Sequence, residues 1–217
     1  FDMEKYELKT YVTRTGYNLA QLELDYYQHR ILSELFEHFN TLYFKGGTCL
    51  QKCYGIKRFS EDLDFNYEGV DLSEITRVIE RFFGEKIRDY HETPFGTSFS
   101  IVFRGILYSG SEQSLCRISF DFRKGDVYKS PLKKVIRPIY GDLPRYLILA
   151  LDTAEILAEK VRAVMTRHKA RDVFDLNELV LDNVHIDYAL INTKLSSYDL
   201  TFDAGAFHDA LEEKRSI

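Results

Sequence analysis

Residues 44–65 read FKGGTCLQKCYGIKRFSEDLDF, and the order of apolar, glycine and acidic residues in this stretch predicts the fold. Its apolar start predicts a short buried strand, which Gly46 and Gly47 end. Thr48 is a favourable N-cap residue and predicts a helix directly after the glycines. Between residues 59 and 65, apolar and polar residues alternate, which is the pattern of a half-buried strand. The stretch therefore predicts a strand, a glycine turn, a helix and a second strand.

Two aspartates lie on one face of the second predicted strand. Asp62 and Asp64 alternate with apolar residues, so their carboxylates lie side by side, close enough to share one or two divalent cations. Oxygen ligands of this kind favour Mg²⁺, and without a cation the two charges repel each other. In a later predicted strand, Asp121 faces away from Ile118 and Phe120 and supplies a candidate third carboxylate. A solvated strand face is the alternative interpretation of the Asp-x-Asp pattern.

The glycine turn offers a place for a phosphate group. Gly46 and Gly47 carry no side chains, and the helix after them presents free backbone N–H groups and the positive end of its dipole. A tight turn without a ligand is the alternative, because Gly-Gly before a helix is a weak signal alone. Together with Asp62 and Asp64, the turn forms half of a site for a metal ion and a triphosphate.

The rest of the chain predicts a mixed sheet followed by helices. Three of the four prolines fall between residues 131 and 144, and strand patterns are few beyond them. The predicted helices are 19–38, 71–83, 153–167, 171–181 and 186 to the end, and the further strands are 97–107 and 115–122. We therefore predict an α+β fold with a mixed sheet and flanking helices in residues 1–145 and a helical C-terminal part in residues 146–217.

The composition is that of an ordinary globular protein, with 217 residues, 45% of them hydrophobic. The net charge of −5 excludes a protein that binds nucleic acid through its overall charge. Residues 117–145 nevertheless hold eight basic and three acidic residues, with Tyr128 and Tyr140 between them. This segment is a candidate for gripping an RNA backbone and stacking a base, and a solvated loop face is the alternative.

The location is predicted from cysteine usage and hydropathy. Three cysteines in 217 residues argue against a disulfide framework and favour a reducing compartment. No apolar run approaches the ~20 residues that span a bilayer. We expect a cytoplasmic protein without a membrane partner.

A second stretch, EILAEKVRAVMTRHKARDVFDL at residues 155–176, completes a resemblance to a known family. Residues 44–65 look like the Lys-Gly-Gly-Thr turn and Arg-Phe-Ser-x-Asp-x-Asp strand of AbiEii/AbiGii-type nucleotidyltransferase toxins. Residues 155–176 are similar to that family's helical motif, in which a lysine precedes Arg-Asp-x-x-Asp-Leu. These proteins are the toxin half of type IV toxin–antitoxin and phage abortive-infection systems.

The resemblance implies a nucleotidyltransferase fold in residues 1–145 and a Mg²⁺-dependent reaction. A nucleoside monophosphate would pass from a nucleoside triphosphate to an RNA acceptor, with transfer RNA as the implied acceptor and a cognate antitoxin as a further partner. Asp62, Asp64 and Asp121 would hold Mg²⁺, and Lys160, Asp172 and Asp175 would join them in catalysis. The implied nucleotide-binding residues are Lys45, Gly46, Gly47, Thr48, Ser60 and Lys160.

Alternatives stay open for the second motif and for the reaction. Lys160 shares a helix face with Ile156 and Val164, and a surface lysine whose stem covers apolar residues fits the same pattern. Asp172 fits a helix cap, and Asp175 fits an ion pair with a neighbouring arginine. A metal-dependent phosphotransferase or phosphodiesterase would use the same carboxylates, and a nucleotide-binding module would keep the fold without turnover.

Overall fold

Two units with separate sets of contacts make up the chain. Unit 1 consists of Phe1–Gly125 and Lys133–Ala150, and unit 2 consists of Asp126–Leu132 and Leu151–Ile217. The structure is a computed structural model, and it describes residues 3–214. The boundary predicted near residue 145 precedes the last strand of unit 1, and the contacts divide the chain at Leu151.

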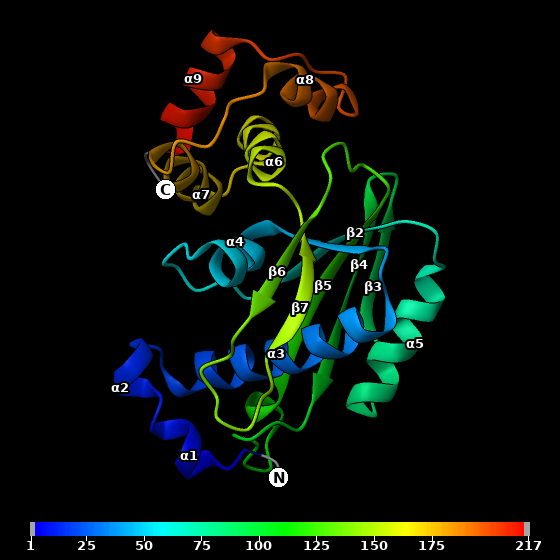
Figure 1. Cartoon of the computed structure of the whole chain (residues 1–217), viewed down its shortest axis with the longest axis vertical. Helices are drawn as coiled ribbons and strands as arrows, with labels where there is room; N and C mark the ends of the chain where they lie inside the picture. Colours follow the sequence, from blue (N-terminus) through cyan, green and yellow to red (C-terminus); the bar gives the residue numbers. More distant parts are fainter. Residues whose placement is uncertain (1–2, 215–217) are drawn as a thin grey trace. The chain divides into compact units, whose positions relative to one another are not determined.

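A mixed sheet of seven strands runs through the described part of unit 1, in the order β3-β4-β5-β2-β1-β7-β6 (Figure 1). Strands β2 and β5 are parallel, as are β1 and β7, whereas β1–β2, β3–β4 and β4–β5 are antiparallel. The strands are β1 (Leu42–Lys45), β2 (Leu63–Tyr67), β3 (Arg88–Thr93), β4 (Gly96–Phe103), β5 (Cys116–Lys124), β6 (Leu132–Ile136) and β7 (Tyr146–Ala150).

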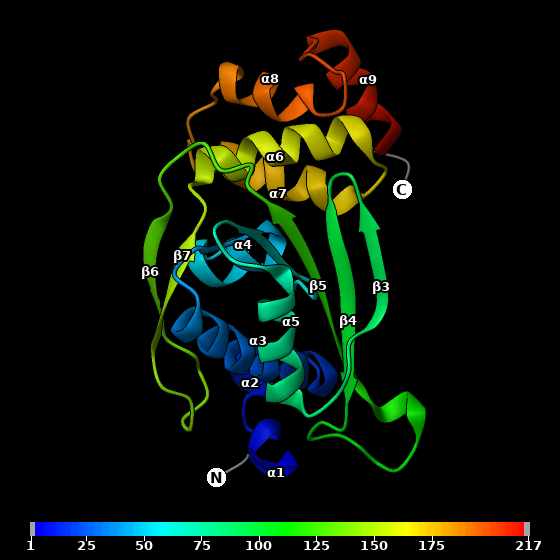
Figure 2. The ribbon, with the colours of Figure 1, turned by 90° about the vertical axis from the view of Figure 1, so that its right-hand side faces the viewer.

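Aromatic side chains on one face of this sheet form part of the hydrophobic core. The ring of Phe65 stacks on Phe122 at 5.1 Å, and the ring of Phe99 stacks on Phe120 at 5.4 Å. Helices α3 (Leu19–His38) and α5 (Leu72–Phe83) cover this face, and Figure 2 shows both lying against the sheet. Because side chains alternate along a strand, burying these phenylalanines leaves the intervening polar residues on the opposite face. That face carries Asp64 and Asp121.

The remaining helices of unit 1 are short. They are α1 (Lys5–Lys9), α2 (Val12–Thr15), α4 (Gly46–Tyr54) and the 3₁₀ turn η1 (Glu112–Ser114). Tyr140 is buried with Leu8, Leu22 and Tyr26 in a core beneath these N-terminal helices, and its hydroxyl donates a hydrogen bond to Asp25 at 2.9 Å. The prediction that Tyr140 stacks on a base is therefore wrong, because its ring is 1% exposed.

Unit 2 is helical. Its elements are α6 (Thr153–Thr166), α7 (Ala170–Leu181), α8 (Tyr188–Ser196) and α9 (Ala204–Lys214). Helix α6 contacts each of the other three, so it forms the centre of the unit. Within residues 3–214, no helix combines the length and apolar composition that crossing a bilayer requires.

The α+β class and the predicted helices 19–38, 71–83, 153–167 and 171–181 are confirmed to within a residue or so at each end. Three local predictions are wrong. The helix after the glycines begins at Gly46 with Lys45 as its N-cap, so Thr48 lies inside its first turn. The strand predicted from residue 59 begins at Leu63, and the last predicted helix is two helices, with residues 215–217 outside the described part.

Candidate active site

The two glycines after β1 permit a close approach of strand β2 and of the loop that precedes it. Gly46 has φ +73°, which favours glycine, and a Cβ there would overlap the carboxylate of Asp64. A Cβ at Gly47 would overlap the guanidinium of Arg58 and lie 2.8 Å from the hydroxyl of Ser60. Neither position has room for a side chain. The start of α4 therefore has a carboxylate, a guanidinium and a hydroxyl directly beside its first backbone N–H groups.

The aspartates lie in one row across the sheet. Asp64 on β2 pairs in register with Asp121 on the parallel strand β5, and with Lys45 on β1. Paired residues point to the same face of a sheet, so the two carboxylates are neighbours. Asp62 directly precedes β2, Asp62 and Asp64 are half-buried, and Asp121 is exposed. The structure thus brings Asp64 and Asp121 to one face of the β2–β5 pair, and Asp62 lies two residues before Asp64 in the loop that leads into β2.

The loop before β2 is fastened by side chains from two helices. The hydroxyl of Thr48 donates to the carbonyl of Asp62 at 2.5 Å, and Nε2 of Gln28 donates to the carbonyl of Ser60 at 3.1 Å. The backbone N–H of Ser60 donates to Oε1 of Gln51 at 3.1 Å. These bonds replace the ladder of a neighbouring strand, which is why the predicted strand does not begin at residue 59. They fix the backbone of Asp62 to helices α3 and α4.

The carboxylates fit a metal ion that is completed by a substrate. In the described chain, no three His, Cys, Asp or Glu side chains are arranged to enclose a metal ion. Mg²⁺ commonly binds through one or two carboxylates together with waters and substrate phosphates rather than in a cage made only of protein. Asp62, Asp64 and Asp121 supply such a partial set beside the glycine turn, where phosphate oxygens would complete it.

The second motif forms a buried ion-pair cluster within unit 2. Nζ of Lys160 lies 3.0 Å from Oδ1 of Asp172 and 2.7 Å from Oδ2 of Asp175, and both aspartates are fully buried. Arg167 donates two further hydrogen bonds to Asp172 at 2.7 and 2.8 Å. Burial raises the pKa of Asp172, but the Arg167 hydrogen bond and the Lys160 charge outweigh it and lower that pKa to about 2.

These contacts decide between the alternatives for the second motif. Lys160 is 6% exposed, so the interpretation as a surface lysine is wrong. Asp172 does not cap α7, whose N-cap is Lys169, and it pairs with Lys160 and Arg167. Lys160 belongs to unit 2 and the carboxylate row to unit 1, so its contact with a triphosphate stays a prediction.

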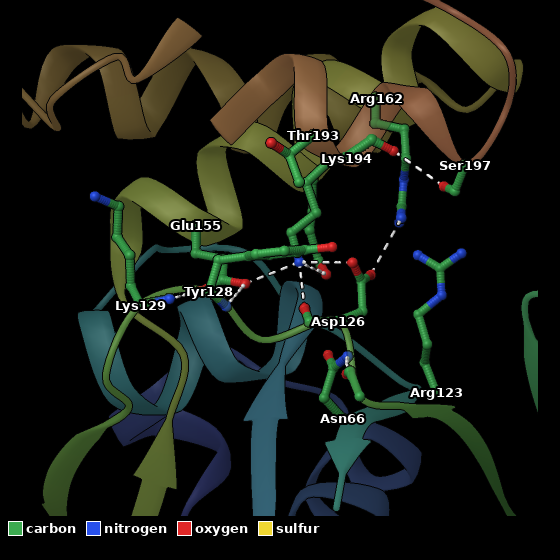
Figure 3. Close-up of polar contacts among 12 residues, drawn as sticks. Asn66, Arg123, Asp126, Tyr128, Lys129, Glu155, Arg162, Thr193, Lys194 and Ser197 are labelled. Atoms are coloured by element: carbon green, nitrogen blue, oxygen red, sulfur yellow. Dashed lines mark hydrogen bonds and ion pairs between the residues drawn. The ribbon is translucent and has the colours of Figure 1, made fainter. Parts of the chain in front are cut away.

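A second lysine in unit 2 is completely buried, and no sequence pattern indicated it (Figure 3). Nζ of Lys194 on α8 lies 2.8 Å from Glu155, 3.3 Å from Asp126 and 3.4 Å from Glu159. It also lies 4.9 Å from the centre of the Tyr128 ring, which is a cation–π distance. Burial lowers the pKa of Lys194, and the three carboxylates outweigh burial and raise it.

Glu155 extends this cluster to the backbone of the segment 126–132. The backbone N–H groups of Tyr128 and Lys129 donate to its carboxylate at 3.0 and 2.8 Å. The acid therefore bonds to one ammonium and two amides while fully buried. This arrangement explains why the segment packs with α6 and α8, and it gives Glu155 a structural role.

The sequence matches a known protein family over most of its length. A profile of the family described as nucleotidyl transferase AbiEii toxin, type IV TA system, matches residues 30–216. The chain belongs to the AbiEii family. It is a nucleotidyltransferase-family enzyme and a toxin of the type IV toxin–antitoxin class.

Solved structures share the AbiEii fold. MenT4, a nucleotidyltransferase toxin from Mycobacterium tuberculosis, superposes with a TM-score of 0.65 at 23% identity, covering 88% of this chain and 68% of that one. JHP933 from Helicobacter pylori gives a TM-score of 0.59 at 21% identity, covering 89% of this chain and 88% of that one. No curated protein sequence matches the chain.

The basic segment of this AbiEii protein is less uniform than its composition suggests. Residues 117–145 are shared between the two units. Arg123 is buried and donates from Nε to the carbonyl of Phe95 at 2.7 Å. Lys129 pairs with Asp187 at 3.2 Å. Part of the local positive charge therefore has an intramolecular partner.

Two residues that fasten the loop before β2 were missed by sequence reasoning. Gln28 is 0% exposed on α3, and Gln51 lies on α4. A signal existed for Gln28, because it falls on the buried face of an amphipathic helix, where an amide requires hydrogen-bond partners. Nothing in the sequence pairs Gln51 with Ser60, which is nine residues further on.

Proposed function

We propose that this AbiEii protein transfers a nucleoside monophosphate from a Mg²⁺-bound nucleoside triphosphate to a hydroxyl group of RNA, with transfer RNA as the acceptor. The observation that carries the proposal is the pairing of Asp64 with Asp121 directly beside the glycine turn that starts α4. In this proposal the protein acts in the cytoplasm, where a cognate antitoxin controls it.

The triphosphate binds at the start of α4 in this proposal. The backbone N–H groups of Gly46 and Gly47 and the positive end of the helix dipole bind its terminal phosphates. Lys45 is the N-cap of the helix, and Ser60 lies against Gly47 with its hydroxyl. Thr48 contributes through its backbone and through its hold on the Asp62 loop, because its hydroxyl already donates to the Asp62 carbonyl.

The carboxylates serve the transfer step. Asp62, Asp64 and Asp121 would hold Mg²⁺, which when bound neutralises the triphosphate and makes the acceptor hydroxyl more acidic. The hydroxyl oxygen bonds to the α-phosphorus, the bond from that phosphorus to the pyrophosphate oxygen breaks, and pyrophosphate leaves. The hydroxyl proton passes to Asp121, the exposed member of the row. Charge neutralisation and in-line positioning provide most of the rate.

The choice of RNA rests on two supports. The family is a family of toxins, and the resemblance of both motifs implies transfer RNA as the acceptor. Residues 117–145 also carry a local charge of +5 in a chain whose net charge is −5. Lys160, Asp172 and Asp175 enter the proposal through the resemblance, and their buried ion pairs give them a structural role that a test has to separate from catalysis.

The test uses purified protein, Mg²⁺, each of the four α-labelled nucleoside triphosphates and total cellular RNA. Asp62→Asn is compared with Glu61→Gln, a matched control that removes the neighbouring exposed carboxylate. We expect label on an RNA of transfer-RNA size with the wild type and Glu61→Gln, and none with Asp62→Asn.

Other products would contradict the proposal in distinct ways. Label on a protein would indicate a different acceptor, and shortened RNA without incorporated label would indicate a phosphodiesterase. If folded protein binds Mg²⁺ and nucleotide and labels nothing, the chain is a binding module.

A further inference from the structure

The row of paired residues continues past the carboxylates to the edge of the sheet. Asp121 on β5 lies opposite Ser98 on β4, and Ser98 lies opposite His91 on β3. Register partners point to the same face, so Ser98 and His91 share the face of Asp121. Adjacent strands are about 4.8 Å apart, which places His91 two strand spacings, or about 10 Å, from Asp121.

In-line attack at the α-phosphorus indicates from which side of this row the acceptor hydroxyl approaches. The glycine turn that follows β1 marks the side of the terminal phosphates, and pyrophosphate leaves toward that side. The attacking oxygen approaches from the opposite side of the α-phosphorus. Across the sheet, β2 and β5 with their carboxylates lie between β1 and the β4–β3 hairpin. The acceptor therefore reaches the carboxylates over β4 and β3.

The hairpin presents an open surface suited to a polymer. All six residues of β3 are exposed, Ser98 is half-buried, and β3 is an edge strand. Small molecules bind mostly in concave pockets, whereas an extended strand of nucleic acid can lie along an exposed sheet face and be held by scattered polar groups.

Charge on this face favours a phosphate backbone. Arg117 lies on β5 four residues before Asp121 on the same face, and Arg88 pairs with Ser100 beyond a register shift that separates it from His91. Arg117 donates from Nη1 to Asp89 at 2.5 Å and to the hydroxyl of Ser100 at 3.1 Å, and its side chain is 56% exposed. Asp89 and Asp121 balance the charges of Arg88 and Arg117 on this face, and Mg²⁺ held by the carboxylate row would make the face positive when the acceptor binds.

We propose that this face of the β4–β3 hairpin, formed by Ser98, His91, Arg88 and Arg117, is the acceptor subsite and binds the last nucleotides of a single-stranded RNA end. Ser98 contacts the terminal ribose, and the His91 imidazole donates a hydrogen bond to the next phosphate or 2′-hydroxyl. Arg88 and Arg117 contact phosphates further from the reacting end. The inference rests on the proposed function and adds the binding surface for its acceptor.

The test measures RNA binding separately from transfer. The probe is a fluorescent single-stranded oligoribonucleotide ending in a 3′-deoxy sugar, titrated with the full chain at several salt concentrations. The variants are His91→Ala and Arg88→Gln. The matched control is Tyr90→Ala, which alters the residue between them on the same exposed strand, a position that lies on the opposite face from His91.

We expect His91→Ala to weaken RNA binding roughly tenfold and to raise the acceptor KM by a similar factor, with an unchanged KM for the nucleoside triphosphate. Arg88→Gln reduces the slope of log K against log salt by about 0.7, the value for one phosphate contact on a single strand. Tyr90→Ala changes neither quantity. Equal RNA binding by all four proteins would overturn the proposal, as would an equal loss with Tyr90→Ala.

The two proposals fail in different ways. If the wild type transfers no nucleotide to RNA but its RNA binding depends on His91, the proposed reaction fails and the acceptor surface stands. If the wild type modifies RNA and the variants keep the acceptor KM of the wild type, the reaction stands and this surface is wrong. Modification of a protein with RNA binding independent of His91 would exclude both.

Discussion

Carboxylates occur in two contrasting settings in the two units. In unit 2, Glu155 and Asp172 are fully buried, and each bonds to a lysine that is itself buried. In unit 1, Asp121 lies on an exposed strand face, and its side chain has no hydrogen bond or ion pair with any described residue. Its register partner Asp64 carries the same charge.

This difference separates acids whose charge the fold compensates from an exposed acid, Asp121, whose charge it does not compensate. A buried carboxylate is stable in a fold only when fixed cations or donors compensate it, and the acids of unit 2 have both. Neighbouring carboxylates at the surface of unit 1 gain nothing for the fold from their proximity, because like charges repel. In the proposed function, a cation and a triphosphate that bind beside them compensate this repulsion.

The largest expected effect is on the stability of unit 2. Lys194→Met leaves the buried carboxylates of Glu155 and Glu159 and the partly buried carboxylate of Asp126 without their shared ammonium, and we expect a loss of roughly 3–5 kcal/mol in unfolding free energy. Lys160→Met should cost less, because Arg167 still bonds to Asp172. Urea unfolding measures both. A stable Lys160→Met protein that has lost transfer activity would show that Lys160 acts mainly in catalysis.

The next prediction compares one carboxylate of unit 1 with one carboxylate of unit 2. We expect Asp121→Asn to reduce transfer by roughly 10²–10³-fold while changing the unfolding free energy by less than about 0.5 kcal/mol. Glu155→Gln should do the reverse, because it weakens charged hydrogen bonds worth about 1.5–3 kcal/mol but leaves the carboxylate row intact. The measurements are the transfer activity per folded molecule and the urea midpoint of unfolding for each variant. If both variants lose mainly transfer activity, or both lose mainly unfolding free energy, the distinction between exposed and buried acids is wrong.

A smaller effect is expected where Thr48 on α4 holds the loop before β2. Thr48→Val keeps the shape of the buried side chain but removes the hydroxyl that bonds to the Asp62 carbonyl. We expect stability to fall by about 1 kcal/mol and transfer to fall by roughly 10–100-fold, since groups that orient ligating carboxylates affect activity on that scale. Thr48→Ser, which restores the hydroxyl, is the control and should recover most of the activity. An active Thr48→Val protein would mean that the loop needs no such anchor.

The smallest effect is a pH dependence of stability. The pKa of Asp172 is about 2 in the folded protein and about 3.9 in an unfolded chain. A depressed folded pKa stabilises the protein above pH 4, and this contribution is lost as the pH falls from about 4 to 2. Arg167→Gln removes the hydrogen bonds that do most to lower this pKa, so its unfolding free energy should fall less steeply over that range. If the urea midpoints of the wild type and Arg167→Gln fall by the same amount between pH 4 and 2.5, Arg167 does not lower the pKa of Asp172.

Sequence patterns predicted the parts of the molecule that repeat at a regular spacing. The helix at 19–38 and the faces of the strands around Asp64 and Asp121 follow from periodicity, because burial of one face dictates which residues alternate. The glycine turn was also readable, since Gly46 adopts a conformation that other residues avoid.

The features that the sequence did not predict depend on contacts between residues far apart in the chain. Strand β3, with the sequence RDYHET, is exposed on both faces and has no apolar alternation to indicate it. The loop before β2 looks like a strand by alternation, yet Gln28 supplies its hydrogen bonds from more than 30 residues away. The burial of Lys194 requires acids from two other segments of unit 2, and no local pattern encodes such a meeting.

The path of the chain has a consequence for how this protein can be divided. The polypeptide leaves unit 1 after Gly125, returns at Lys133 and leaves again after Ala150. A gene truncated after residue 150 would still encode Tyr128 and Lys129 but would lack Glu155, which accepts their backbone hydrogen bonds. Because unit 2 consists of two separate stretches of sequence, a single crossover after residue 150 cannot exchange it as a whole. Exchange of the helical part between two relatives would require that residues 126–132 be exchanged together with residues 151–217.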